Sequence, residues 1–310
     1  MYLSTDNLRS RDDIQDYFTN LSKRLFINYH RSFFDIFSNK NWLIKSDVET
    51  FLNLSGYEII SNRGNRIIAK KRQDKIKEYS VSIIIPARNE EKNIPNIIPS
   101  IPKFGKSQEI IFVEGGSSDK TWQEIVKIKG VVKIKQRGKG KANAIRLGLS
   151  KAKGEILMIY DSDRTIDAKE LIKFYKVLSN GTGEFINGSR LVYPMEKDAM
   201  RTLNKIGNIC FSYLFTWIFG QNFKDTLCGT KAFFKKDYVK FKKLKDDPFG
   251  DFELIFGAIE NNLKVVEIPA HYKERVYGST NIKRFYHGLL LLKMVLIAFW
   301  QFRIRRSSLR

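Results

Sequence analysis

Apolar and polar residues alternate through most of the chain in the manner of strands separated by helices. Five short apolar runs have the length of buried strands, and amphipathic stretches lie between most of them. This alternation is typical of a parallel sheet covered by helices, so we predict an α/β fold. The predicted strands are 81–85, 109–113, 131–134, 155–160 and 184–187.

The N-terminal part of the chain follows a different pattern. Over residues 14–37, apolar residues recur at helical spacing, as on one face of an amphipathic helix. Ser46 and Glu49 form a capping box, which predicts a second helix that ends near Gly56.

A hairpin is expected next, because 57–60 and 66–68 are short β-prone runs on either side of a turn-forming segment. A charged stretch follows, and the strand and helix alternation begins after it. We therefore expect a small N-terminal α+β extension at 1–72, a catalytic domain at 80–280 and a C-terminal segment at 281–310.

The C-terminal segment contains an apolar stretch, 288–302, which Lys293 interrupts. It is shorter than the roughly 20 residues that a spanning helix needs. Four arginines follow within 303–310, and an apolar face with a basic flank is attracted to anionic lipid. We predict an amphipathic helix on an anionic membrane surface; an ordinary packed terminal helix is the alternative.

Composition narrows the classes of partner. The 55 Lys and Arg outnumber the 33 Asp and Glu, giving a formal charge of +22 that favours phosphates, nucleic acid or anionic lipid. Cys210 and Cys228 belong to no CxxC or Cys/His cluster, so neither a disulfide framework nor a zinc site is indicated. The start of the chain lacks the apolar core of a signal peptide, and we expect a peripheral protein on the cytoplasmic face of a membrane.

The loops after the first three predicted strands suit a nucleotide. The loop 86–91 leads into a helix whose first turn presents backbone donors, and 113–121 has glycines that permit close approach, with Glu114 as an acceptor for a base or ribose. The basic loop 137–142 suits diphosphate oxygens. A plain glycine-rich turn and a solvated basic turn are the alternatives. Neither a Walker loop nor a dinucleotide fingerprint is present, which disfavours an ATPase or a dehydrogenase.

The fourth apolar run ends directly in Asp161-Ser162-Asp163. Ligands of open α/β sheets bind beyond the carboxyl ends of the strands, so both carboxylates are expected at the mouth of the sheet. Such a pair can bind Mg²⁺ or Mn²⁺ together with diphosphate oxygens, because hard cations favour oxygen ligands. Helix capping by either aspartate is the alternative.

Three further segments, 188–190, 225–231 and 248–254, carry polar residues next to apolar runs. The first two are candidates for contact with an acceptor. In the third, Asp251 is placed to remove a proton from an attacking hydroxyl, or simply to stabilise the start of a helix.

Taken in order, these segments resemble the family 2 inverting glycosyltransferases, and more narrowly the dolichyl- or polyprenyl-phosphate mannose and glucose synthases. The resemblance covers about 81–300 and implies an A-type glycosyltransferase fold, which is a Rossmann-like, mostly parallel sheet flanked by helices. The segments that carry it are SIIIPARNE, VEGGSSDKT, GKGKA, YDSD, NGSR, DTLCGTKAF and FGDFEL.

The resemblance implies roles for individual residues. Asp161 and Asp163 hold the metal, Mg²⁺ or Mn²⁺, and Asp163 and Asp251 are the catalytic pair. The family often has two acids after the second strand, where this chain has Glu114 and Gly115. The expected donor contacts are Pro86, Ala87, Arg88, Glu90, Glu114, Gly116, Asp119, Lys139 and Asp161, and the expected acceptor or phosphate contacts are Arg190, Thr230, Arg275 and Lys283.

The donor and acceptor follow from the same resemblance. A nucleotide sugar of the GDP-mannose or UDP-glucose type is expected as donor, and polyprenyl phosphate as acceptor. A saccharide hydroxyl is the alternative acceptor, and only then is Asp251 required as a base. Direct displacement at the anomeric carbon inverts its configuration in either case. The apolar stretch 203–220 resembles the interface helix of these synthases.

The N-terminal part weakly resembles the closing part of class I methyltransferases over 34–60. The cofactor-binding half of that fold is absent from the sequence, so we expect a remnant, a docking module or half of a split fusion, with a separate methyltransferase or membrane partner. A nucleic-acid binder is disfavoured because no recognised binding motif appears. A nucleotidyltransferase lacks its activating loop here, and a silent scaffold is disfavoured by the two aspartates.

Overall fold

A computed structural model describes residues 2–4, 57–63, 66–71, 77–190, 202–242, 244, 247–275, 277 and 284–304. The chain divides into two compact units, one of Met1–Lys77 with Gly220–Asn222 and the other of Glu78–Phe219 with Phe223–Arg310. The helices predicted over 14–37 and after Ser46 lie outside the described residues.

The first unit contains a three-stranded sheet. The predicted hairpin is confirmed, since β2 (Tyr57–Arg63) pairs antiparallel with β3 (Arg66–Lys71). The short strand β1 (Tyr2–Ser4) pairs with the other edge of β3, which the sequence pattern did not indicate.

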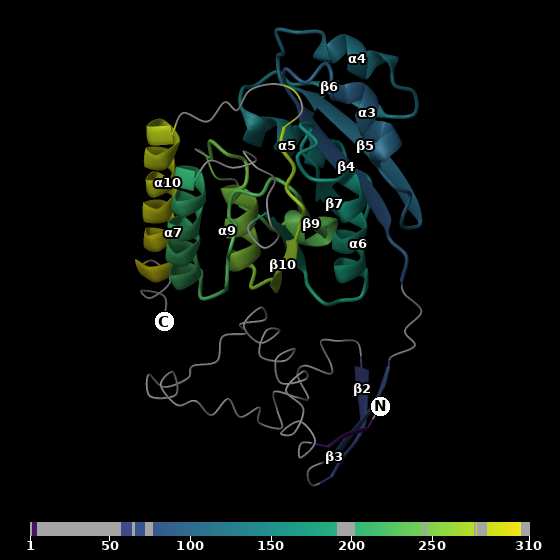
Figure 1. Ribbon diagram of the computed structural model, residues 1–310, viewed down its shortest axis with the longest axis vertical. Coiled ribbons are helices and arrows are strands. Elements are labelled where there is room, and N and C mark those ends of the chain that lie inside the picture. Colours follow the sequence, from purple (N-terminus) through teal and green to yellow (C-terminus); the bar gives the residue numbers. More distant parts are fainter. Residues whose placement is uncertain are drawn as a thin grey trace. The chain divides into compact units, whose positions relative to one another are not determined.

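The second unit is built on a seven-stranded sheet of order β10-β8-β9-β7-β4-β5-β6 (Figure 1). All five predicted strands are confirmed. They are mutually parallel where they pair, whereas β9 runs antiparallel between β7 and β8. Neither β9 nor β10 was predicted as a strand. The strands are β4 (Ser80–Ala87), β5 (Ser107–Glu114), β6 (Val132–Lys135), β7 (Ile156–Ile159), β8 (Phe185–Ser189), β9 (Lys231–Phe234) and β10 (Val265–Pro269).

Apolar cores lie on both faces of this sheet. Along β4, Ile84 packs into one core and its neighbours Ile83 and Ile85 into the other, because successive side chains of a strand point to opposite faces. The first core takes in α5, α7, α9 and α10, and the second takes in α3, α4 and α6. The helices are α3 (Ile94–Ser100), α4 (Thr121–Lys127), α5 (Lys141–Lys151), η3 (Ala168–Glu170), α6 (Leu171–Ser179), α7 (Thr202–Phe219), α8 (Lys235–Tyr238), α9 (Phe252–Glu260), α10 (Arg284–Phe299) and the π-helical η4 (Trp300–Ile304).

Helix α5 lies close against the sheet because Gly148 has no side chain. A Cβ added there would overlap the side chain of Ile84 and lie 3.1 Å from Cγ2 of Val113. This close packing fixes the helix over β4 and β5, with its first residue, Lys141, at the carboxyl end of the sheet.

Helices α7 and α10 run side by side (Figure 1). Trp217 of α7 stacks on Phe299 of α10, with ring centroids 5.8 Å apart, and the guanidinium of Arg303 lies over the Trp217 ring. Within the described residues, neither these helices nor any other combine the length and apolar character needed to cross a membrane.

Candidate active site

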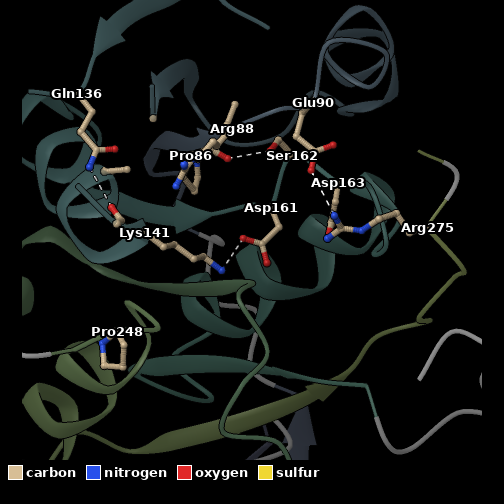
Figure 2. A pocket seen from close by; sticks show the side chains of 14 residues that line it. Pro86, Arg88, Glu90, Gln136, Lys141, Asp161, Ser162, Asp163, Pro248 and Arg275 are labelled. Carbon is tan, nitrogen blue, oxygen red and sulfur yellow. Dashed lines mark hydrogen bonds and ion pairs between the residues drawn. The ribbon is translucent and has the colours of Figure 1, made fainter. Parts of the chain in front are cut away.

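A pocket of about 390 Å³ opens at the carboxyl ends of β4, β5, β6 and β7 (Figure 2). Each of these neighbouring parallel strands delivers the residues that follow it to the same edge, as expected for an open α/β sheet. The pocket is lined by Pro86, Ala87, Arg88, Glu90, Gly115, Gln136, Gly140, Lys141, Ala144, Asp161, Ser162, Asp163, Pro248 and Arg275.

The acidic triplet after β7 is anchored so that its two carboxylates line the pocket. The Ser162 hydroxyl donates to the carbonyl oxygen of Pro86 (2.9 Å), which ties the triplet to β4. One oxygen of Asp163 accepts from both the backbone N–H and the hydroxyl of Thr165, at 3.1 and 2.9 Å. Asp163 therefore stabilises the turn that follows β7 with one of its two oxygens, whereas the cap of the next helix, η3, is Asp167.

Each aspartate also has a cationic partner. Nζ of Lys141 lies 2.8 Å from Oδ1 of Asp161, and Nη2 of Arg275 lies 2.6 Å from Oδ2 of Asp163. Burial alone would raise the pKa of Asp161, but Lys141, with smaller contributions from Lys231 and Arg190, holds that pKa below its usual value. Asp161 is thus a carboxylate in this setting, as a metal or cation partner requires.

Glu90 is the third carboxyl group at the pocket. Burial raises its pKa to about 7, although a hydrogen bond from Asn93 and the charge of Arg275 favour the ionised form. Arg275 reaches it as well, with Nη1 3.6 Å from Oε1 of Glu90. The neighbouring negative charges of Asp161 and Asp163 act in the same direction as burial.

The donor atoms at this edge suit a hard divalent cation, because the carboxylate oxygens of Asp161 and Asp163 face one pocket. Among the described residues, no group of three or more His, Cys, Asp or Glu side chains is arranged to hold a metal. Mg²⁺ commonly takes one or two carboxylates and completes its shell with water and substrate phosphate, so two aspartates fit that chemistry.

Several of the residues predicted to contact the donor do not line the pocket, and two of them form hydrogen bonds within their own loop. Glu114 is buried and accepts from the backbone N–H of Ser117, and Asp119 accepts from the N–H and hydroxyl of Thr121. Gly116, at φ 73°, forms the turn between them. Lys139 is exposed and does not line the pocket, whereas Lys141 does. The predicted donor roles of these residues stay predictions.

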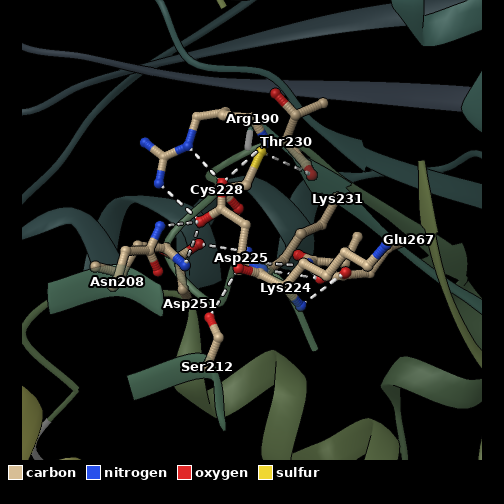
Figure 3. Close-up of polar contacts among 12 residues, drawn as sticks. Arg190, Asn208, Ser212, Lys224, Asp225, Cys228, Thr230, Lys231, Asp251 and Glu267 are labelled. Carbon is tan, nitrogen blue, oxygen red and sulfur yellow. Dashed lines mark hydrogen bonds and ion pairs between the residues drawn. The ribbon is translucent and has the colours of Figure 1, made fainter. Parts of the chain in front are cut away.

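The predicted acceptor contact Arg190 has a structural partner. Its Nε and Nη2 bind the fully buried carboxylate of Asp225 at 2.7 and 2.8 Å, as Figure 3 shows. Asn208 of α7 donates to the same carboxylate at 2.9 Å. The guanidinium therefore ties the end of β8 to the segment that precedes β9, and its Nε and Nη2 are directed at Asp225. Arg190 does not line the pocket.

Thr230 and Asp251, also predicted at the site, are buried beside it. Asp251 precedes α9, with no hydrogen bond from its side chain to the helix, and its Oδ1 lies 2.8 Å from Nζ of Lys231. Lys231 is fully buried and also donates to the carbonyl oxygen of Cys228. Lys283 lies outside the described residues.

Lys141, Gln136 and Lys231 lie at or beside the site but were not selected individually from the sequence, although Lys141 belongs to the basic loop 137–142 and Lys231 to the segment 225–231. Gln136 follows β6 and donates to the carbonyl oxygen of Gly140, which shapes the entry to α5. Partial burial lowers the pKa of Lys141, but Asp161 and then Asp251 outweigh it and raise that pKa above its usual value. The second lysine of the GKGKA segment was the feature of the sequence that could have indicated Lys141.

Comparisons with known proteins agree with this geometry. The description "Glycosyl transferase family 2" matches residues 82–241. The chain is 30% identical over 206 residues to the glycosyltransferase AglJ of Haloferax volcanii, covering 66% of each protein. It is 27% identical over 242 residues to a UDP-N-acetylglucosamine–dolichyl-phosphate N-acetylglucosaminyltransferase of Methanococcus voltae, covering 69% of this chain and 96% of that protein.

Among solved structures, the chain resembles glucosyl-3-phosphoglycerate synthase from Mycobacterium tuberculosis, crystallised with Mn²⁺, UDP and glucosyl-3-phosphoglycerate. The TM-score is 0.56 at 16% identity, and the match covers 71% of this chain and 80% of that one. The predicted A-type glycosyltransferase fold is confirmed by this match together with the sheet order.

Proposed function

Because the chain belongs to glycosyl transferase family 2 and is a hexosyltransferase, we propose that it transfers a hexose from a nucleotide sugar to polyprenyl phosphate at a membrane surface. The observation that carries the proposal is the placement of Asp161 and Asp163 in a pocket at the carboxyl ends of four parallel strands. A donor of the GDP-mannose or UDP-glucose type suits this site, and the name of the Methanococcus voltae relative supports a lipid phosphate as acceptor.

We propose that Asp161 and Asp163 hold Mg²⁺ or Mn²⁺. The bound ion would neutralise negative charge on the departing nucleoside diphosphate. The Mn²⁺ and UDP in the Mycobacterium tuberculosis structure support this assignment. Pro86, Arg88 and Glu90 line the same pocket and are proposed to bind the donor.

The chemical nature of the acceptor determines whether the reaction needs a general base. A phosphate oxygen forms the bond to the anomeric carbon as the bond to the diphosphate breaks, and no proton is removed because the phosphate is already ionised. Asp251, held by Lys231, then positions the acceptor side of the pocket. If a saccharide hydroxyl is the acceptor, Asp251 must take its proton.

An exposed apolar surface supports contact with lipid. We define it as the apolar face: Ile209, Tyr213, Leu214, Trp217, Leu289, Leu292, Leu296, Trp300 and Ile304. These residues recur at helical spacing on two adjacent helices, α7 and α10 with η4. Large exposed aromatics beside Arg303 suit the boundary between lipid tails and anionic headgroups. We propose that this face lies on the cytoplasmic leaflet, where the charge of +22 favours anionic lipid.

For the N-terminal extension, residues 1–72, we propose a docking role for a separate partner. The three-stranded sheet of β1, β2 and β3 is the described part of this extension. The weak resemblance of 34–60 to the end of a methyltransferase supports no catalytic role.

The decisive experiment incubates the protein with a panel of UDP- and GDP-sugars and Mn²⁺. It scores transfer to polyprenyl phosphate, transfer to a saccharide, and release of sugar to water. Transfer to the lipid phosphate that stops in EDTA supports the proposal. Transfer to the saccharide alone would show that the acceptor is a saccharide hydroxyl and not polyprenyl phosphate. Transfer that persists in EDTA would contradict the proposed metal dependence.

A further inference from the structure

We propose that Lys141 is a diphosphate-binding residue that holds Asp161 when no donor is bound, so that divalent cation and nucleoside diphosphate bind cooperatively. This inference rests on the donor site proposed above. It singles out one side chain of the basic loop 137–142, whose contact with Asp161 links the metal position to the phosphate position.

The contact between Lys141 and Asp161 is accessible from the pocket. The Nζ to Oδ1 distance is 2.8 Å, and the two side chains are 33% and 31% exposed. Both residues line the pocket (Figure 2). Both side chains are therefore within reach of a ligand in the pocket. A ligand can replace either partner of the ion pair without unfolding the surrounding structure.

The place of Lys141 in its helix also favours an anion. It is the first residue of α5, preceded by Gly140 at φ 87°. A cation at this positive end of a helix is electrostatically unfavourable unless an anion lies beside it. Asp161 supplies that anion. A diphosphate between α5 and the sheet would supply a larger one, and it would also meet the free backbone N–H groups of the first turn.

The opposite side of the pair is closed by backbone. A Cβ added to Gly229 would overlap Oδ2 of Asp161 and come 2.6 Å from Nζ of Lys141. The segment that precedes β9 therefore packs directly on the pair. An ammonium released from Asp161 has the pocket as its open side, where the donor phosphates are proposed to lie.

Competition for Asp161 then couples the two ligands. The Lys141 ammonium contacts Oδ1 of Asp161, so a divalent cation that takes this oxygen must displace the lysine. Once displaced, the ammonium forms a charge-assisted contact with a phosphate oxygen, which strengthens diphosphate binding. Each ligand favours the other, and the effect on the two affinities is equal. Arg275 forms a similar ion pair with the other aspartate, Asp163, with Nη2 2.6 Å from Oδ2.

The test measures binding rather than turnover. Mn²⁺ affinity is determined by electron paramagnetic resonance and calorimetry, with and without UDP or GDP, for wild type and for Lys141→Met. In the wild type, the nucleotide is expected to tighten Mn²⁺ binding by about tenfold or more. In Lys141→Met, Mn²⁺ alone should bind several-fold tighter, and the enhancement by nucleotide should fall by about tenfold.

Matched variants make the outcome specific. Lys151→Met removes an exposed lysine at the other end of the same helix and should behave as wild type. Lys141→Arg should keep the coupling, and Lys141→Gln provides a second loss variant whose folding is checked by circular dichroism. Unchanged coupling in folded Lys141→Met and Lys141→Gln overturns the role of Lys141 while leaving the donor site intact. Failure of the wild type to bind Mn²⁺ with either nucleotide overturns the proposed donor site and this inference together.

Discussion

Lys231 and Asp251 form a buried ion pair beside the pocket, with Nζ and Oδ1 2.8 Å apart and the two side chains 0% and 4% exposed. Lys231 is the first residue of the antiparallel strand β9 and is in register with Ile159 of β7, two residues before Asp161, so the pair lies beside the acidic triplet. A charge this deeply buried depends on its partner, since removing one member leaves the other uncompensated.

We predict that Lys231→Met destabilises the protein by about 3–5 kcal/mol, because the Asp251 carboxylate is left without its cation. The double variant Lys231→Met with Asp251→Asn should recover much of that loss, because the remaining side chains are neutral. Denaturation by urea of the wild type, both single variants and the double variant gives the coupling energy. A double variant that is no more stable than Lys231→Met would contradict the pairing.

The acidic triplet makes a prediction about turnover. Asp163→Asn keeps an oxygen for the Thr165 turn but removes the charge, so hexose transfer should fall by about 10²-fold or more while the circular dichroism spectrum is unchanged. Asp167→Asn is the matched control, since Asp167 is partly exposed and pairs with Lys273 at 3.1 Å. Equal loss in both variants would mean that the effect is not specific to the pocket.

The sequence predicted the triplet and the parallel strands because each follows a local rule. An apolar run of strand length that ends in two acids places those acids at the carboxyl edge of the sheet. Lys231 breaks such a rule, since a lysine is rarely fully buried and its partner lies 20 residues further along the chain. The insertion of β9 between β7 and β8 buries Lys231 in the sheet, where Asp251 contacts it from the start of α9.

That Lys141 lines the pocket and Lys139 does not could not be predicted from the sequence, for a related reason. Both lysines belong to one basic segment, and which of them faces the donor site depends on where α5 begins. Helix ends are set by one or two residues that a pattern of apolar positions does not determine. The ion pair of Arg190 with Asp225 could not be predicted either, because the two residues lie 35 positions apart in the chain.

The glycines of two helices provide a packing test. Gly148→Ala should lower the free energy of unfolding by about 1–3 kcal/mol, because the added methyl group overlaps the Ile84 side chain in the core. In α7, a Cβ on Gly207 would meet nothing within 4 Å, so Gly207→Ala should raise stability by about 0.5–1 kcal/mol. Thermal and urea unfolding of the two variants measures both signs. Similar effects in both would show that helix propensity outweighs packing.

Glu267 predicts a dependence of stability on pH. Burial raises its pKa to about 7 from an ordinary 4.5, although backbone N–H groups of Asp225 and Lys224 and the amide of Asn187 favour the ionised form. The folded protein therefore keeps a proton that the unfolded chain releases above about pH 4.5. The free energy of unfolding should fall by up to about 3 kcal/mol as the pH rises through this interval.

Replacing that carboxyl tests the assignment. Glu267→Gln cannot ionise, so the decline in stability between pH 4.5 and 7 should flatten relative to wild type. Glu78→Gln, an exposed site, should keep the wild-type slope. Urea unfolding at several pH values compares the three proteins, and equal slopes in all of them would show that Glu267 is not the group responsible.

The apolar face is expected to bind anionic vesicles. Leu289 and Leu296 are 67% and 61% exposed and lie two turns apart on α10, so both point to the same side of the helix. If that side enters a lipid surface, the double variant Leu289→Asp with Leu296→Asp loses two apolar contacts and adds two charges that anionic headgroups repel. Binding to vesicles that contain phosphatidylglycerol should fall by about tenfold or more. Val239→Asp, a change at a 72% exposed residue outside this face, should bind as the wild type does, and undiminished binding by the double variant would refute the membrane role.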